Sequence, residues 1–111
     1  MSVSTVKLSL DHLRALGYVV EVVERWVPDP AGGVRVRRDL FGILDLVALR
    51  GDETLGVQTT TRGELARRAR KIAESEHVGA LREAGWTLTV HGWHQPRGPR
   101  TRWELEELDV S

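Results

Sequence analysis

One carboxylate lies inside an otherwise apolar segment. Asp45 is the only polar residue of the run 40–49, which reads LFGILDLVAL. A run that is apolar on both faces predicts a central strand covered by helices on each side. An ionised carboxylate there costs several kcal/mol unless a partner, a metal ion or a raised pKa compensates it. Asp45 is therefore the first candidate for chemistry.

The turn after this run predicts which residue lies opposite Asp45. Gly51-Asp52 between two apolar runs is typical of a two-residue hairpin loop joining strands over 38–49 and 54–60. That loop pairs Arg50 with Glu53 and sets Asp45 across from Gln58, whereas a three- or five-residue loop would change the register. Opposite Cβ atoms lie about 4.5–5.5 Å apart. Both side chains would then reach one cation.

The remaining patterns predict the elements that position these two residues. Helices are expected over 4–16, ended by Gly17, and from 62 to 75, with Thr61 and Glu64 as a capping box. A β-rich run covers 18–27, one or two helical turns cover 77–84, and strands cover 86–93 and 101–108. The order α-β-β-β-α-β-β predicts an α/β domain in which the first three strands form an antiparallel meander. The helical segment 62–84 then crosses over to a parallel strand, so helices cover both faces of a central mixed sheet.

Composition limits the class of protein. A chain of 111 residues predicts one domain over 1–111, and the absence of cysteine excludes disulfides and thiolate metal sites. No apolar run approaches the roughly 18–20 residues of a membrane span and no signal peptide is evident, so a cytoplasmic protein without membrane contact is expected. The formal net charge is +0, which argues against indiscriminate binding to nucleic acid.

The basic residues are nevertheless unevenly distributed. All 16 except Lys7 and Lys71 are Arg, the side chain that forks best onto phosphate, although high-GC coding bias gives the same excess. Two clusters are candidates for contacting a DNA backbone: Arg35, Arg37 and Arg38 before the Asp45 run, and Arg62, Arg67 and Arg70 on the predicted helix. His91 and His94 differ by three positions, which puts them on opposite faces of a strand and does not predict a shared zinc ion.

Two segments resemble a known family. RDLFGILDLVA over 38–48 and VQTT over 57–60 resemble the PD-(D/E)xK nuclease superfamily, and the small resolvase-like and phage-type nucleases look most similar. The resemblance implies a restriction-endonuclease-like fold and a single nuclease-like domain. It also implies metal-dependent hydrolysis of DNA with Mg²⁺ or Mn²⁺.

The resemblance assigns roles to individual residues. Asp45 matches the metal-binding Asp, Gln58 occupies the place of the second carboxylate, and Thr60 stands where the family has Lys. Lys71 on the next helix is the candidate to replace that Lys, with Arg62 and Arg68 as substitutes. An upstream acid completes such sites, and Glu24 is slightly preferred to Glu21 because it lies nearer to Asp39, itself a further candidate ligand.

These expectations lead to three hypotheses. The first is a Mg²⁺-dependent endonuclease of Holliday-junction-resolvase type that acts on branched DNA as a homodimer. The second, motivated by Gln58 and Thr60, is a catalytically inactive nuclease-fold module that binds nucleic acid or a protein partner. The third is a small structural protein in which Asp45 only specifies the core.

Overall fold

The N-terminal helix lies within the predicted range 4–16 and ends before Gly17. The structure is a computed structural model that describes residues 4–111. Helix α1 (Thr5–Ala15) begins after Ser4, whose hydroxyl accepts a hydrogen bond from the Lys7 amide, and Gly17 follows its end with φ 91°. A positive φ is readily adopted by glycine, so the predicted end at Gly17 is confirmed. No helix within residues 4–111 is long and apolar enough to cross a membrane.

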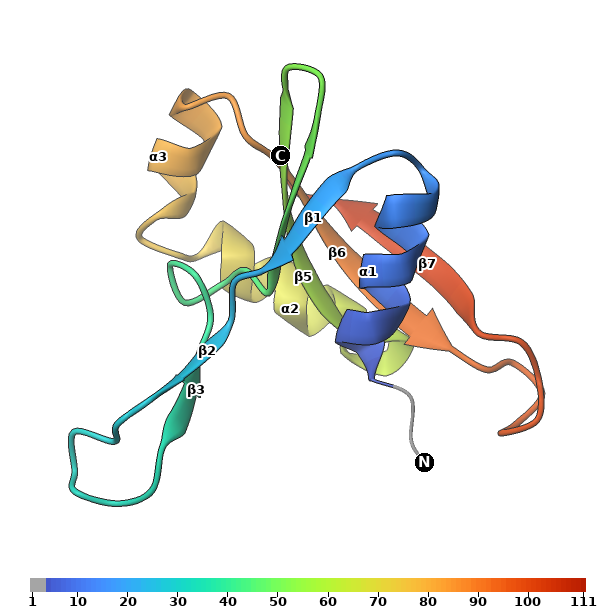
Figure 1. Cartoon of the computed structure of the whole chain (residues 1–111), viewed down its shortest axis with the longest axis horizontal. Helices are drawn as coiled ribbons and strands as arrows, with labels where there is room; N and C mark the ends of the chain where they lie inside the picture. Colours follow the sequence, from blue (N-terminus) through green and yellow to red (C-terminus); the bar gives the residue numbers. More distant parts are fainter. Residues whose placement is uncertain (1–3) are drawn as a thin grey trace.

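Five strands form one mixed sheet in the order β1-β4-β5-β6-β7 (Figure 1). The strands are β1 (Val19–Val22), β4 (Leu46–Arg50), β5 (Glu53–Thr61), β6 (Thr87–His94) and β7 (Glu104–Asp109). Only β5 and β6 are parallel. The crossover between them contains the 3₁₀ turn η1 (Arg62–Glu64) and the helices α2 (Leu65–Ala73) and α3 (Val78–Glu83). The predicted α/β class, mixed sheet and parallel crossover are confirmed.

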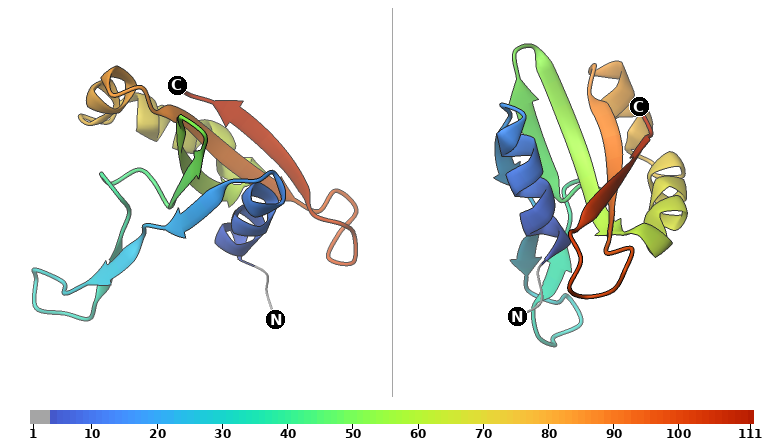
Figure 2. Two further views of the ribbon diagram at one scale, coloured as in Figure 1. Left: turned by 45° about the horizontal axis from the view of Figure 1, so that its top comes forward. Right: turned by 90° about the vertical axis from the view of Figure 1, so that its right-hand side faces the viewer.

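Helices cover both faces of this sheet, as predicted. Figure 2 shows α1 on one side and α2 with α3 on the other. The face beneath α1 is packed by one core cluster, Leu13, Val20, Leu46, Ala48 and Val57. The opposite face is packed by a second, Ile43, Leu44, Leu65, Ile72, Val78, Leu81, Leu88 and Val90. At Gly56 a Cβ would lie 2.8 Å from Leu44 Cδ1, so any larger residue there would displace the Leu44 side chain.

A two-stranded arm departs from the main sheet and corrects one prediction. The run 18–27 is not a single strand: β1 ends at Val22, and β2 (Arg25–Val27) pairs with β3 (Val36–Arg38) in a separate antiparallel ribbon. Figure 1 shows this arm projecting away from the five-stranded sheet. The predicted antiparallel meander is therefore formed by β1, β4 and β5, with the arm inserted between β1 and β4 along the chain.

The apolar run 40–49 is also not one continuous strand. Leu40 carbonyl accepts hydrogen bonds from the amides of Ile43 and Leu44, which closes a turn, and β4 begins only at Leu46. Phe41 and Gly42 in this turn have φ 55° and 74°. Ile43 and Leu44 are apolar because they are buried in the core after the turn, not because they extend a strand.

The predicted capping box is wrong. Thr61 precedes η1 without a side-chain capping hydrogen bond, and α2 itself begins at Leu65. Glu64 instead forms an ion pair with Arg67, with 2.6 Å between Oε2 and the guanidinium nitrogen. The 3₁₀ turn at the start moves the first α-helical residue beyond the position that a capping box from Thr61 requires.

Candidate metal centre

The hairpin brings Asp45 and Gln58 together as predicted. Arg50 pairs with Glu53 and Leu46 with Val57, and the Asp45 amide donates to the Val57 carbonyl at 2.8 Å. The Gln58 side-chain amide donates to Asp45 Oδ2 at 2.7 Å. The expected register is confirmed, and both side chains lie on the sheet face covered by α2.

Two further carboxylates join Asp45 from outside the sheet. Oxygen atoms of Glu24, Asp39 and Asp45 all lie within 4.8 Å of one another, an arrangement that could hold a metal ion. Glu24 lies in the short link between β1 and β2, Asp39 directly follows β3, and Asp45 directly precedes β4. Of the two upstream acids considered, Glu24 is therefore in the cluster. Glu21 is exposed on β1, paired with Val47.

Burial makes the charge on Asp45 unfavourable. Its side chain is 3% exposed, and loss of solvent raises its pKa from 3.8 to about 7. The Thr59 amide, 2.8 Å from Oδ2, and the Gln58 amide lower the pKa in part, while the nearby Asp39 raises it. A bound divalent cation would reverse this balance, because it stabilises the ionised carboxylate.

Three oxygen atoms at this site are buried without a hydrogen-bond partner among residues 4–111. They are Glu24 Oε2, Asp45 Oδ1 and Gln58 Oε1. Glu24 Oε2 lies 3.6 Å from Arg37 Nε, an ion-pair distance. Orphaned buried acceptors are uncommon in folded proteins and cost free energy. A hard cation takes oxygen ligands of this kind, so the donor set fits Mg²⁺, Mn²⁺ or Ca²⁺.

Gln58 can serve the site in two ways, as a hydrogen-bond donor through Nε2 or as a metal ligand through Oε1. In the structure its Nε2 donates to Asp45 Oδ2 and reaches Asp39 Oδ2 at 3.5 Å. It thereby supplies the positive end of a dipole between two carboxylates. Metal ligation would use Oε1 instead, after the amide turns.

A basic groove opens beside the acids. It has a volume of about 790 Å³, and Asp39 forms part of its wall. Its cationic lining comes from the arm and from α2: Arg37, Arg38, Arg68 and Lys71. Lys71, the candidate to replace the family's Lys, therefore shares one groove with Asp39 of the cluster.

The other residues singled out from sequence lie in different places. Thr60 is buried on β5, two positions beyond Gln58 and on the same face, where it brings no charge. Arg62 points toward β7, with Nε 3.0 Å from Glu106 Oε2. Arg67 is paired with Glu64, and Arg35 and Arg70 are exposed. Of the six arginines predicted to contact DNA, Arg37 and Arg38 line the groove.

Sequence reasoning overlooked an aromatic pair at the groove. Phe41 is 45% exposed, and its ring centroid lies 5.5 Å from that of His77. Both line the groove. Phe-Gly two residues after an acid is a turn signal that could have separated Phe41 from the core residues of the same run.

Comparison of the chain with models of protein families, with curated proteins and with solved structures found no match.

Proposed function

We propose that this protein is a metal-dependent DNA endonuclease with a restriction-endonuclease-like fold. One observation carries the proposal: acids from three separate chain segments converge beside a groove lined by cations. Metal-binding acids next to phosphate-binding cations are the parts that phosphodiester hydrolysis needs. The resemblance of residues 38–48 and 57–60 to the PD-(D/E)xK superfamily supports the same activity.

In the proposed mechanism Glu24, Asp39 and Asp45 would hold Mg²⁺ or Mn²⁺. A bound cation would supply polarisation of the scissile phosphate and activation of water for the attack. The Thr59 amide and Gln58 orient Asp45. Lys71 and Arg68 lie where they can neutralise charge on the substrate, a role that Thr60 cannot perform.

Branched DNA is the proposed substrate and a homodimer the proposed form. A chain of 111 residues offers little surface for a junction, whereas two copies present two grooves and two sets of acids. Phage-type nucleases are among the small nucleases that the two segments resemble.

The central test replaces Asp45 in a cleavage assay. We expect wild-type protein to nick supercoiled plasmid and a four-way junction with Mg²⁺ or Mn²⁺, and Asp45→Asn to reduce the rate at least ~100-fold, since metal charge stabilisation supplies several kcal/mol. Asp11→Asn is the control, because Asp11 is an exposed acid of α1 paired with Lys7. Equal rates for wild type and Asp45→Asn would refute the proposal.

A second test introduces the carboxylate that PD-(D/E)xK nucleases have at the position of Gln58. Gln58→Glu places a fourth carboxylate at the site, so we expect the Mn²⁺ dissociation constant to fall about tenfold, because added ligand charge tightens binding of hard cations. Cleavage should rise with it. Isothermal titration calorimetry measures the affinity, and Val19→Glu, at an exposed position of β1, is the control. Unchanged affinity in Gln58→Glu would place the cation away from this strand.

A catalytically inactive module is the second candidate function. The hydrogen bond from Gln58 to Asp45 and the neutral Thr60 favour it, because both features partly satisfy the site without a metal ion or a catalytic base. It predicts no cleavage with any divalent metal and salt-sensitive DNA binding that survives Asp45→Asn. If neither cleavage nor binding occurs and Asp45→Leu is tolerated, Asp45 serves only the core.

A further inference from the structure

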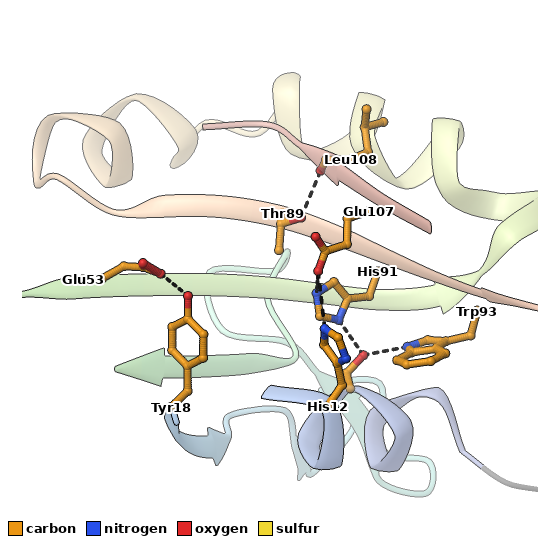
Figure 3. Close-up of polar contacts among 9 residues, drawn as sticks. His12, Tyr18, Glu53, Thr89, His91, Trp93, Glu107 and Leu108 are labelled. Carbon is orange, nitrogen blue, oxygen red and sulfur yellow. Dashed lines mark hydrogen bonds and ion pairs between the residues drawn. The ribbon is translucent and has the colours of Figure 1, made fainter. Parts of the chain in front are cut away.

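A second polar cluster lies on the opposite face of the sheet, beneath α1. Figure 3 shows His12 of α1, His91 of β6 and Glu107 of β7 pointing toward one another. His91 and Glu107 are cross-strand partners in the β6–β7 pair. This cluster is made by three elements, none of which contributes an acid to the first site.

His91 is the buried centre of the cluster. Its side chain is 0% exposed, and its Nδ1 lies 2.8 Å from Ser9 Oγ, which also accepts a hydrogen bond from Trp93 Nε1 at 2.8 Å. Its other nitrogen, Nε2, is buried without a hydrogen-bond partner among the residues that the structure describes. Nε2 lies 3.3 Å from Glu107 Oε1, within ion-pair distance but without hydrogen-bond geometry.

His12 brings a second imidazole to the same oxygen. Its Nε2 lies 3.7 Å from Glu107 Oε1, and the two imidazole rings are nearly perpendicular, with centroids 5.8 Å apart. The side chains of His12 and Glu107 are 34% and 54% exposed. The cluster therefore has one buried nitrogen and two donors that are accessible from solvent.

We propose that His12, His91 and Glu107 form a zinc-binding site. Two imidazoles and one carboxylate are a ligand set that Zn²⁺ takes readily, with a fourth position left for water. Donor atoms bound to zinc at 2.0–2.1 Å in a tetrahedron lie roughly 3.3–3.4 Å apart. The His91–Glu107 distance matches this spacing. The His12–Glu107 distance of 3.7 Å is longer, so binding requires His12 to rotate toward the other two ligands.

The surroundings of His91 support this role. Burial, and then the charge of His12, lower the pKa of His91 from 6.5 to about 4, so the ring is neutral at neutral pH, as a zinc ligand must be. The contact with Ser9 orients the ring through the nitrogen that would not bind the metal. Such an outer contact is the usual support of a metal-bound histidine.

The site differs from the pair considered in the sequence. His94, three residues from His91, lies 3.6 Å from Glu104 instead. The other two proposed ligands lie far from His91 in the sequence: His12 is 79 positions earlier, on a helix, and Glu107 is 16 positions later, on a strand. No spacing along one element could have revealed the group.

Cobalt substitution tests the site. Co²⁺ replaces Zn²⁺ and absorbs strongly in the visible range only at tetrahedral nitrogen and oxygen sites, whereas an all-oxygen octahedral site absorbs weakly. The titration uses the Asp45→Asn chain, so that the acidic cluster does not compete. We expect one equivalent of Co²⁺ to give the strong band and one equivalent of Zn²⁺ to abolish it.

Three variants in this background assign the ligands. His12→Gln and Glu107→Gln alter partly exposed side chains, so the fold should survive, and each should weaken Zn²⁺ binding at least ~100-fold, more than the 10–100-fold of an outer contact. His91→Gln should do the same, with circular dichroism as the check on folding. His77→Gln, which alters an exposed histidine lining the basic groove, is the matched control.

The outcomes separate this site from the proposed nuclease. A strong band lost in His12→Gln and kept in His77→Gln supports the zinc site whether or not the protein cleaves DNA. A weak octahedral spectrum, or Zn²⁺ affinity unchanged in both His12→Gln and Glu107→Gln, overturns it and leaves the cluster as an ion-pair network.

Discussion

Asp45→Asn is expected to stabilise the metal-free protein by about 4 kcal/mol at pH 8. The folded protein holds Asp45 with a pKa of about 7, against 3.8 for the free side chain, and each unit of difference corresponds to 1.36 kcal/mol. Above pH 7, folding therefore buries the ionised Asp45 carboxylate, which lowers the free energy of unfolding. Asparagine removes the charge and keeps the shape, with its carbonyl accepting from Gln58 and Thr59. Its amide then donates toward the other two acids.

Urea unfolding in the presence of a chelator measures this gain. Because the pKa of Asp45 is raised in the folded protein, the free-energy cost of ionising it is absent below pH 4, grows as pH rises through 4–7, and is complete above pH 7. The variant and the wild type should accordingly have similar stability at pH 4 and differ most at pH 8. Asp52→Asn in the exposed hairpin turn is the control, with an expected change within ~0.5 kcal/mol. A variant no more stable than wild type at pH 8 would contradict the assignment.

The second large effect is the pH dependence of stability that comes from His91, which Asp45 offsets in the wild type. His91 has a lowered pKa of about 4, so its contribution opposes that of Asp45. Stability from a buried neutral His91 is complete above pH 6.5 and is lost as pH falls through 6.5–4, by about 3 kcal/mol. Stability linked to Asp45 changes in the other direction over nearly the same range. The metal-free wild type should therefore show a nearly flat pH profile between 4 and 6.5.

Single variants should show separately how Asp45 and His91 make the free energy of unfolding depend on pH. In Asp45→Asn the free energy of unfolding should rise by about 3 kcal/mol from pH 4 to 6.5. In His91→Gln it should fall by about 4 kcal/mol from pH 4 to 7. Chemical denaturation at half-unit pH steps resolves these changes, and the double variant should again be flat. Parallel profiles in all four proteins would show that neither group is held at a shifted pKa.

Local signals in the sequence predicted the part of the site that lies within one hairpin. Gly51-Asp52 set the register, and the register brought Gln58 to Asp45. The end of α1 at Gly17 and the parallel crossover from β5 to β6 were also predictable, because each depends on a short segment or on chain connectivity.

The rest of the site depends on contacts between distant segments. Nothing in the alternation of 18–27 showed that the chain leaves the sheet after Val22, and that departure decides between Glu24 and Glu21. The turn at Phe41 was hidden because buried residues of a turn and of a strand are equally apolar. His12, His91 and Glu107 meet only after three elements have packed.

Two of the three clustered acids lie at the base of the β2–β3 arm, so movement of the arm would move them. Asp45 is anchored by the rigid sheet, whereas Glu24 and Asp39 stand at the two roots of the projecting ribbon. Tilting the ribbon at its base would carry both of these carboxylates relative to the third. A contact that tilts the arm would therefore change the spacing of the three carboxylates, and with it the proposed affinity of the cluster for a metal ion.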